Sequence, residues 1–324
     1  MKAIVCNEFG LPEKLKLSEL PDPIPSPNQI LIAVEACGVN FPDVLIIQNK
    51  YQFKPELPFA PGGEVAGKII GMGDQVQGFQ RGQSVLALCG WGGFAEKVTV
   101  DADRVFPLPL GLSAEVAATT LYTYGTSYHG LKDRANLQSG ETLLVLGAAG
   151  GVGLAAVELG KVMGAKVIAA ASSEEKLALC REKGADLTIN YENEDLKTRI
   201  KELTQGKGVD VVYDPVGGKF TEPALRGMAW KGRYLIVGFA NGEIPQIPMN
   251  LPLLKGCSIL GVFWGQFSKV EAKASFQNIR QLVAWIQEGK IKQHIGKKYS
   301  LEQSPEALQA ILNRKMLGKG VVLI

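Results

Sequence analysis

The 324-residue sequence has only two histidines and five cysteines, and the cysteines lie far apart. No two of them have the Cys-x-x-Cys spacing of many zinc sites and redox motifs. Isolated cysteines of this kind are typical of reduced thiols in a cytoplasmic protein. The histidines, His129 and His294, lie near no cysteine or acidic cluster with the spacing of metal ligands. We therefore expect both histidines to be structural or surface residues, and we expect no metal site.

The sequence also lacks an excess of one charge and any long apolar run. Lysine and arginine number 35, aspartate and glutamate number 32, and the net charge is only +3. This near-balance argues against a surface dedicated to nucleic acid. No stretch approaches the length of about 18 apolar residues that a membrane span requires. The first residues lack the apolar core of a signal peptide, so we expect a cytoplasmic protein without a membrane partner.

What the sequence does contain falls into regions of different texture. Residues 1–120 are rich in proline and glycine between short strand-like runs, which indicates an irregular, mostly β domain. Residues 122–262 alternate between strand and helix patterns, which predicts a parallel sheet with helices on both faces. The later segments are expected to return to the first domain. The predicted strands of the parallel sheet are 142–147, 166–171, 187–190, 209–214, 233–238 and 257–263.

The stretch "LLVLGAAGGVGLAAVELGK", residues 143–161, places a glycine-rich turn between a strand and a helix. In this context such a turn can hold a dinucleotide. Gly150 lets the backbone approach a pyrophosphate, Gly153 lets the helix pack on the strand, and the helix N-terminus offers unpaired N–H groups. The first glycine of the usual Gly-x-Gly-x-x-Gly pattern is Ala148 here. A tight turn without a ligand is the alternative, but the surrounding βαβ pattern favours a dinucleotide site.

The end of the next predicted strand, "KVIAAASSEEK", indicates which dinucleotide is bound. An NAD site usually has a carboxylate there, bonded to the ribose hydroxyls. Here Ser172 and Ser173 stand at that position, and Lys176 follows one helical turn later. Small hydroxyl residues and a cation favour the 2′-phosphate of NADPH. The alternatives are a capping box of Ser172 with Glu175 and a solvated Lys176, and these roles can coexist with phosphate binding.

Several segments together carry a family resemblance: "ACGVNFPDVLIIQNKY", "PFAPGGEVAGKI", "GGFAEKVTV", "TYGTSYHGLKDRANLQSGETLLVLGAAGGVG", "INYENEDL", "VDVVYDPVGG" and "YLIVGFANG". The chain resembles the medium-chain dehydrogenase/reductase superfamily, and specifically its zinc-independent NADPH:quinone oxidoreductase branch, the relatives of zeta-crystallin. The resemblance implies an α/β protein in which a Rossmann NADP-binding domain, 122–263, is inserted into a mostly β GroES-like catalytic domain, 1–121 plus 264–324. Asn49 and Glu158 depart from the glycine and glutamine that are usual in this branch.

The resemblance also bears on metal binding. Zinc-dependent alcohol dehydrogenases of the superfamily bind their catalytic zinc through the cysteine of "CGVC" and the histidine of "GHE". The corresponding residues here are Asn40 in "CGVN" and Gly63 in "GGE". The four-cysteine lobe that binds structural zinc is absent as well. The resemblance therefore implies catalysis without a metal, which argues against alcohol oxidation.

Without a metal, catalysis rests on positioning and hydrogen bonding around the nicotinamide. By resemblance, Asn40 and Asp43 lie near the nicotinamide and Tyr51 lies on the loop of the acceptor pocket. Asn40 would fix the nicotinamide or polarise a carbonyl, and Tyr51 would donate a proton or stack on a quinone. The alternative for Asp43 is a turn or capping residue, and the alternative for Tyr51 is ordinary packing.

The resemblance implies cofactor contacts at the ends of several predicted strands, where ligands of doubly wound sheets bind. Tyr191 follows such a strand end and could reach the 2′-phosphate, with ordinary packing as the alternative. Lys319 is a weaker candidate. The remaining implied contacts are Thr126, Gly150, Gly151, Val152, Ser172, Lys176, Val216, Gly238, Phe239 and Phe263.

The function that these features predict is NADPH-dependent hydride transfer to a quinone. A reductase of the activated double bond in an enone or enoyl thioester is the first alternative, because both reactions deliver hydride to a conjugated acceptor. A non-catalytic NADPH-binding protein is the second, since some relatives serve as lens crystallins. The resemblance also implies a homodimer, and the apolar strand "CSILGVFWG" at the sheet edge is a candidate interface.

Overall fold

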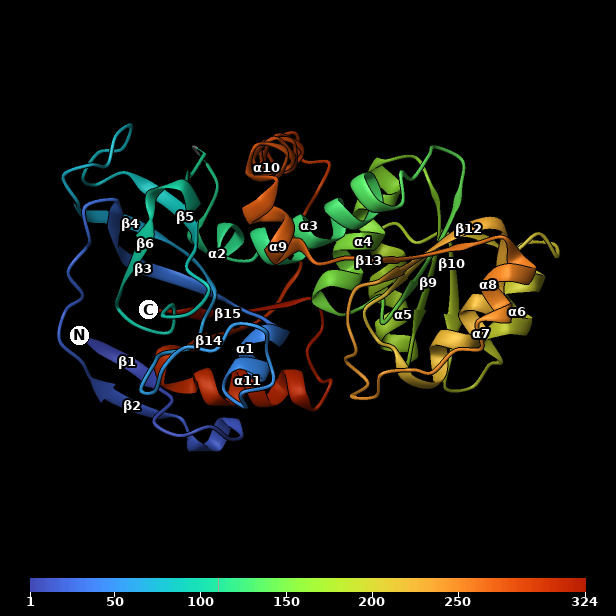
Figure 1. Cartoon of the computed structure of the whole chain (residues 1–324), viewed down its shortest axis with the longest axis horizontal. Helices are drawn as coiled ribbons and strands as arrows, with labels where there is room; N and C mark the ends of the chain where they lie inside the picture. The colour runs from blue at the N-terminus through green and yellow to red at the C-terminus, as the bar shows by residue number, and fades with distance from the viewer. Residues whose placement is uncertain (110) are drawn as a thin grey trace. The chain divides into compact units, whose positions relative to one another are not determined.

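The computed structural model describes residues 1–109 and 111–324, and the chain divides into two compact units. The first unit comprises Met1–Tyr122 and Gln293–Ile324, and the second comprises Thr123–Lys292. In Figure 1 the first unit therefore combines the blue N-terminal part of the ribbon with its red C-terminal part. In the described residues, no helix is both long and apolar enough to cross a bilayer.

The first unit is mostly β, as the sequence predicts. Its main sheet has the strand order β14-β15-β3-β4-β5-β7, with β6 also paired to β3. All its pairs are antiparallel except β14–β15. The strands are β1 (Lys2–Val5), β2 (Lys16–Glu19), β3 (Gln29–Val39), β4 (Glu64–Met72), β5 (Ser84–Leu88), β6 (Lys97–Asp101), β7 (Val105–Pro107), β14 (Ile295–Ser300) and β15 (Lys319–Leu323); the α-helices are α1 (Phe41–Ile46), α2 (Ala114–Ala117) and α11 (Ser304–Leu312).

The core of the first unit follows from alternation along its strands. In β3, half-buried and buried residues alternate from Gln29 to Ala36, which is typical of an antiparallel strand with one buried face. Ile30 and Ile32 are fully buried in this core. The C-terminal strand completes the sheet, because Val322 of β15 pairs with Cys37 of β3. The last strand of the chain thus returns to the first unit, as expected.

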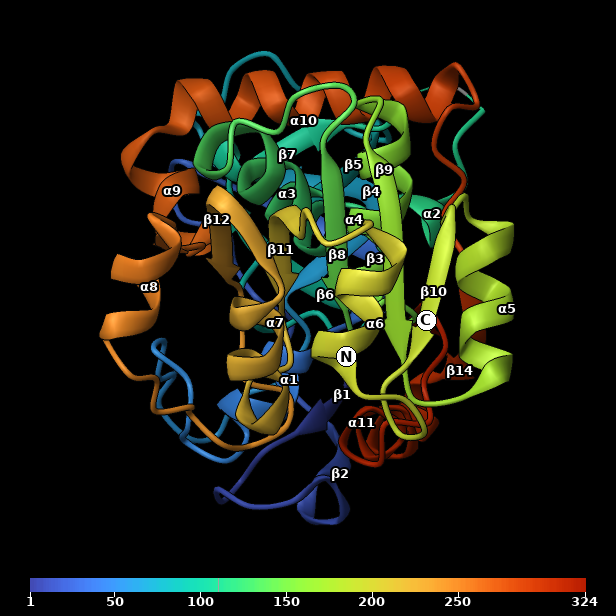
Figure 2. The ribbon, with the colours of Figure 1, turned by 90° about the vertical axis from the view of Figure 1, so that its right-hand side faces the viewer.

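The second unit contains the predicted parallel sheet, in the order β10-β9-β8-β11-β12-β13. Figure 2 shows β10, β9, β8, β11 and β12 side by side in that order. Since the order reverses between β8 and β11, the sheet has a topological switch point there. The strands are β8 (Thr142–Leu146), β9 (Lys166–Ala171), β10 (Leu187–Asn190), β11 (Val209–Asp214), β12 (Met228–Ile236) and β13 (Ser258–Gly261).

Helices cover both faces of the parallel sheet. On one face, α6, α7 and α8 share a buried cluster with strand residues such as Leu144 and Ile168. On the other face, Gly160 of α4 packs so closely that an added Cβ would lie 2.7 Å from Leu143. The doubly wound Rossmann arrangement is confirmed. The helices are α3 (Leu121–Tyr128), α4 (Gly151–Val162), α5 (Glu174–Glu182), α6 (Leu196–Leu203), α7 (Thr221–Arg226), α8 (Asn250–Lys255), α9 (Trp264–Val270) and α10 (Ala272–Gln287).

The boundary near the C-terminus differs from the expected one. The sequence analysis assigns 264–324 to the catalytic domain, whereas 264–292 belongs to the second compact unit. The physical reason is a polar contact that helical periodicity does not show. Asn278 on α10 donates to Asp133 at 2.7 Å and accepts from Lys132 at 2.6 Å, so α10 is held to the segment after α3.

Candidate cofactor and active site

The glycine turn after β8 has the geometry that the sequence predicts. Gly147 adopts a left-handed conformation, with φ of 57°. An added Cβ at Gly153 would lie 2.3 Å from the carbonyl oxygen of Gly147, so the helix–strand packing requires glycine there. At Gly150 an added Cβ would meet only this same oxygen, at 3.4 Å, which is an ordinary contact. The fold therefore does not need Gly150, whose open backbone leaves room for a ligand.

The N-terminus of α4 favours an anion. This 12-residue helix has Gly150 as its N-cap, no side-chain cap and no acidic residue in its first turn. Its first N–H groups and the positive end of its dipole therefore favour a phosphate. Ser127 of α3 donates to the carbonyl of Val152 at 2.9 Å, so the neighbouring candidate Thr126 belongs to a helix that contacts this turn.

At the end of β9, a lysine is held beside a serine. The Lys176 ammonium donates to the Ser172 hydroxyl at 2.8 Å. The expected capping box of Ser172 with Glu175 is wrong, because the N-cap of α5 is Ser173, which accepts from the backbone N–H of Lys176. Since Ser173 takes the capping role, the Ser172 hydroxyl is left to pair with Lys176. A hydroxyl and an ammonium thus occupy the position where an NAD site has a carboxylate.

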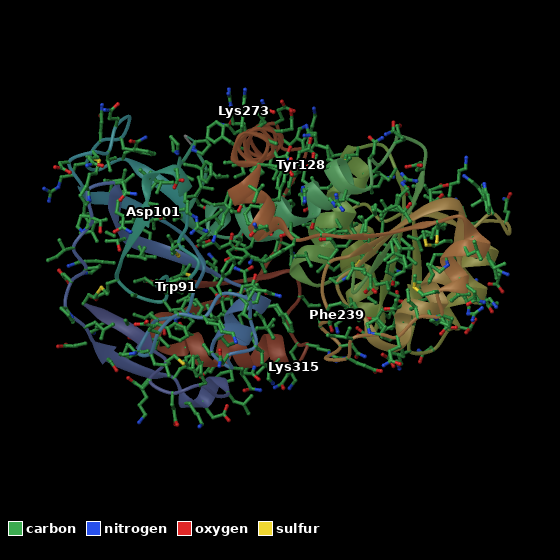
Figure 3. All side chains as sticks on the ribbon, viewed as in Figure 1. Trp91, Asp101, Tyr128, Phe239, Lys273 and Lys315 are labelled. Atoms are coloured by element: carbon green, nitrogen blue, oxygen red, sulfur yellow. The ribbon has the colours of Figure 1, made fainter. Side chains whose placement is uncertain are left out.

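The other predicted contacts also follow strand ends. Tyr191 comes directly after β10, and its ring centroid lies 4.3 Å from that of Phe220. The loops after β11 and β12 are joined by a backbone hydrogen bond of 2.8 Å from Asn241 to Val216. Phe239, labelled in Figure 3, belongs to the second of these loops, directly after the candidate Gly238. Phe263 lies two residues after β13 and is 43% exposed.

Sequence reasoning missed Asp214, the last residue of β11. Its buried carboxylate accepts hydrogen bonds from the backbone N–H groups of Val216 and Gly217, both at 2.8 Å. It also accepts from the hydroxyls of Thr221 at 3.0 Å and Tyr234 at 2.6 Å. Asp214 therefore shapes the loop that carries Val216. The available signal was a carboxylate directly after the apolar run Val211–Tyr213, at the end of a predicted strand.

In the first unit, Asn40 belongs to a buried cluster with Glu64 and Lys319. The Lys319 ammonium donates to Asn40 Oδ1 at 2.6 Å, Glu64 Oε1 at 2.9 Å and the carbonyl of Val39 at 3.1 Å. The Asn40 amide donates in turn to Glu64 Oε1 at 2.9 Å and to the carbonyl of Gly38 at 3.3 Å. The cluster therefore uses both ends of the Asn40 amide and all three ammonium donors, and the predicted cofactor ligand Lys319 is placed with Asn40. Glu64 was not a predicted site residue.

Asp43 lies in the first turn of α1 and is 2% exposed. Its carboxylate accepts from the Asn40 backbone N–H at 2.8 Å, so it has the helix-capping contact considered as an alternative. Burial raises the pKa of Asp43 to about 7, although this bond and the Lys319 charge oppose the rise. Burial, together with the charge of Asp43, raises the pKa of the half-buried Tyr51 to about 12. Asp43 can therefore exchange a proton near neutral pH, whereas Tyr51 keeps its proton.

The described residues contain no group of three or more His, Cys, Asp and Glu side chains that could hold a metal ion. At Gly63, an added Cβ would lie 2.7 Å from the Tyr122 hydroxyl, which leaves no room for a side chain in the present arrangement. His129 is buried, contacts Asp133 through Nδ1 at 2.9 Å and stacks on Phe267. His129 is thus a structural residue, as expected.

Comparisons with known proteins agree with this architecture. Residues 26–110 match the family described as "Alcohol dehydrogenase GroES-like domain", and residues 151–287 match "Zinc-binding dehydrogenase". The quinone oxidoreductase-like protein 2 homolog of Nematostella vectensis is 42% identical over 328 residues, which cover 99% of this chain and 88% of that protein. Rat quinone oxidoreductase is 36% identical, over 100% of this chain and 98% of that protein.

A solved structure extends the likeness to the whole fold. Escherichia coli quinone oxidoreductase, crystallised in complex with NADPH, matches with a TM-score of 0.94 and 28% identity, and each chain is covered completely. The chain belongs to the quinone oxidoreductase branch of the medium-chain dehydrogenase/reductase superfamily. Membership confirms the resemblance and the fold class predicted from the sequence, and it makes the protein an oxidoreductase.

Proposed function

We propose that this protein is an NADPH-dependent reductase that transfers hydride to quinones without a metal. The observation that carries the proposal is the Lys176–Ser172 pair at the end of β9, where no carboxylate is present. The open backbone at Gly150 and the uncapped N-terminus of α4 support the assignment. The NADPH complex of the Escherichia coli relative supports it as well.

Each part of the second unit has its own role in this proposal. The α4 turn would bind the pyrophosphate, and Ser172, Lys176 and Tyr191 would bind the 2′-phosphate. The loops after β11, β12 and β13 would hold the rest of the dinucleotide, as is usual for sheets of this kind. The residues assigned to NADPH are Thr126, Gly150, Gly151, Val152, Ser172, Lys176, Tyr191, Val216, Gly238, Phe239 and Phe263.

Bound NADPH would supply the hydride, and hydride addition to a quinone leaves a hydroquinone monoanion that must take up one proton. We assign the proton to the Asp43 carboxyl group, because its pKa of about 7 suits proton transfer at neutral pH. Tyr51, protonated at this pH, would orient the acceptor by stacking or a hydrogen bond. We assign Asn40 to holding Asp43, since the buried cluster already uses its amide.

Metal independence is part of the proposal, even though one matching family description names zinc. An asparagine and a glycine stand where zinc-dependent relatives have cysteine and histidine ligands. At Gly63, Tyr122 fills the space that a ligand side chain would need. The Lys319 ammonium lies against Asn40 and Glu64, and a fixed cation disfavours a second one beside it.

The phosphate assignment is tested by the double variant Lys176→Ala/Tyr191→Ala. Loss of a charge-assisted contact should raise KM for NADPH by about 30-fold, with KM for NADH nearly unchanged. Steady-state kinetics with both coenzymes measure this difference. Lys197→Ala, which removes an exposed lysine from α6, is the control and should leave both constants unchanged. An equal loss for NADPH and NADH would refute the assignment.

The acceptor is tested by following NADPH oxidation with a panel of quinones and a panel of enones and enoyl-CoA thioesters. Turnover with quinones alone supports the proposal, whereas faster turnover of the enones or thioesters would replace it by the double-bond reductase. Tight NADPH binding without oxidation by any acceptor would favour the non-catalytic alternative.

We also propose a homodimer that forms through the edge of the parallel sheet. β13 is the last strand in the sheet order, and exposed sheet edges tend to pair. Apolar side chains on neighbouring elements support this, since Trp230 on β12 is 68% exposed and Leu253 on α8 is 77% exposed. Light scattering in solution distinguishes the dimer from a monomer.

A further inference from the structure

A buried ion pair lies where three strand ends of the first unit meet. Lys319 begins β15, Glu64 begins β4, and β3 lies between them. The two charged groups are 2.9 Å apart, and the side chains are only 5% and 1% exposed. Burying both charges is costly unless hydrogen bonds satisfy them completely. The cost of burying this pair beside the predicted active site indicates that the pair has a function there.

The hydrogen bonds of the pair lead to the α1 turn. Glu64 Oε2 accepts from the backbone N–H of Tyr122 at 2.9 Å, while Oε1 accepts from Lys319 and from the Asn40 amide. Lys319 contacts the other end of the same amide. The pair thus holds Asn40 from both sides, and the backbone N–H of Asn40 in turn binds the Asp43 carboxylate.

We propose that Lys319 and Glu64 are positioning residues of the reductase, whose ion pair fixes Asn40 and thereby holds the Asp43 carboxyl group in its buried place. The inference rests on the proposed function, because it concerns the group assigned to proton transfer. It replaces the cofactor contact expected of Lys319 with a role in the first unit. It also gives a function to Glu64, which sequence reasoning had not selected.

The charges of the pair act on Asp43 in opposite directions. Lys319 lowers the pKa of Asp43 because a nearby cation favours the carboxylate, and Glu64 raises it because a nearby anion disfavours the carboxylate. The other titratable groups that interact electrostatically with Asp43 are two cysteine thiols and two tyrosine hydroxyls. The groups facing Asp43 are Lys319 from β15, Glu64 from β4, Cys37 from β3, Cys89 after β5, Tyr51 after α1 and Tyr122 from α3.

Two variants should therefore shift the titration of Asp43 in opposite directions. A proton donor is active while protonated, so the rate of quinone reduction should fall as pH rises through its titration. Lys319→Met should move this alkaline limb up by about one pH unit, and Glu64→Gln should move it down by a similar amount. The measurements are the pH profile of kcat and the carbon-13 NMR titration of the Asp43 carboxyl signal, assigned with Asp43→Asn. Damage to packing alone would not produce opposite shifts.

A matched pair of substitutions serves as the control. Lys298 and Glu115 form an ion pair at 2.7 Å in the same unit, and the lysine is 55% exposed. Lys298→Met and Glu115→Gln should leave both the rate profile and the Asp43 titration unchanged. Removal of one buried charge can prevent folding, so Lys319→Met/Glu64→Gln, which leaves no unpaired charge, is the third variant. Its two effects should largely cancel, and the midpoint should return toward that of the wild type.

The outcomes separate the inference from the proposed function. Opposite shifts in the NMR titration and in the rate profile support the positioning role of the ion pair and also proton donation by Asp43. Opposite shifts in the NMR titration with an unchanged rate profile support the positioning role and contradict proton donation by Asp43. An unchanged Asp43 titration in whichever single variants fold, shifts of the same sign in both single variants, or a double-variant midpoint displaced from the wild type by about one pH unit or more would overturn the inference.

Discussion

The two compact units build their candidate sites from different materials. In the second unit the site is mainly backbone: a glycine turn, a helix N-terminus and loops that follow parallel strands. In the first unit it is a cluster of side chains, in which Asn40, Glu64 and Lys319 come from distant parts of the sequence. A backbone site depends on local conformation, whereas a side-chain cluster depends on how strands are paired. Different kinds of substitution should therefore impair the two sites: changes of backbone conformation in the second unit and changes of side-chain charge in the first.

The largest expected effects come from adding a methyl group at each of two glycines in the turn after β8. Gly153→Ala should cost about 3 kcal/mol of unfolding free energy, because its Cβ would lie 2.3 Å from a backbone oxygen. Gly150→Ala should lower stability by at most about 1 kcal/mol, since its Cβ makes one ordinary contact. It should nevertheless abolish NADPH binding, because the methyl group occupies the approach to the pyrophosphate.

Urea unfolding and fluorescence titration with NADPH measure the two effects separately. Wild-type NADPH affinity in Gly150→Ala would show that the backbone of this turn is not the cofactor site. The site of the second unit would then not be built mainly from backbone, and the two units would not differ in this way.

Most of the second unit could be predicted from the sequence. The predicted strands 166–171, 187–190 and 209–214 coincide with β9, β10 and β11. The clearest signal is that of β9, "KVIAAA", which after Lys166 is a continuous apolar run buried on both faces, as is typical of a parallel strand. Once the strands are in order, the residues at their carboxyl ends necessarily share one edge of the sheet. The cap of α5 was misplaced by one residue, since Ser172 and Ser173 are equally good capping residues.

The side-chain cluster of the first unit could be predicted only in part. Asn40 and Asp43 were selected by resemblance, but Lys319 was assigned to the cofactor and Glu64 was not selected. Their contact depends on the pairing of β15 with β3 and of β3 with β4, which brings residues 255 positions apart to hydrogen-bonding distance. Local periodicity carries no information about such pairing. The position of α10 was missed for the same reason.

A smaller effect tests how far the loop after β11 depends on a side chain for its conformation. Asp214→Ala leaves two backbone N–H groups and the Tyr234 hydroxyl without their buried acceptor, which should cost about 2 kcal/mol. Asp214→Asn keeps one acceptor oxygen for the two N–H groups and should retain most of the stability and the NADPH affinity. If Asp214→Ala is as stable as the wild type in urea, the loop is shaped by its backbone alone.

The smallest effect concerns Glu158, a buried acid on α4 that contacts the Tyr124 hydroxyl, the Lys183 ammonium at 3.7 Å and the backbone N–H of Lys292 at 3.2 Å. Burial raises the pKa of Glu158 despite these contacts. An acid with a raised folded-state pKa favours folding while it is protonated, and this contribution is lost as pH rises through that pKa.

The stability of the wild type relative to Glu158→Gln should therefore decrease as pH rises above the ordinary glutamate pKa of about 4. Urea unfolding across this range measures the difference, with the exposed Glu175→Gln as control. A constant difference would mean that Lys183 and the two hydrogen bonds fully offset the burial of the charge. A stability difference that decreases with pH would show that a buried cluster of side chains also affects the stability of the second unit. The two units would then differ in how their ligand sites are built, but both folds would depend on buried polar side chains.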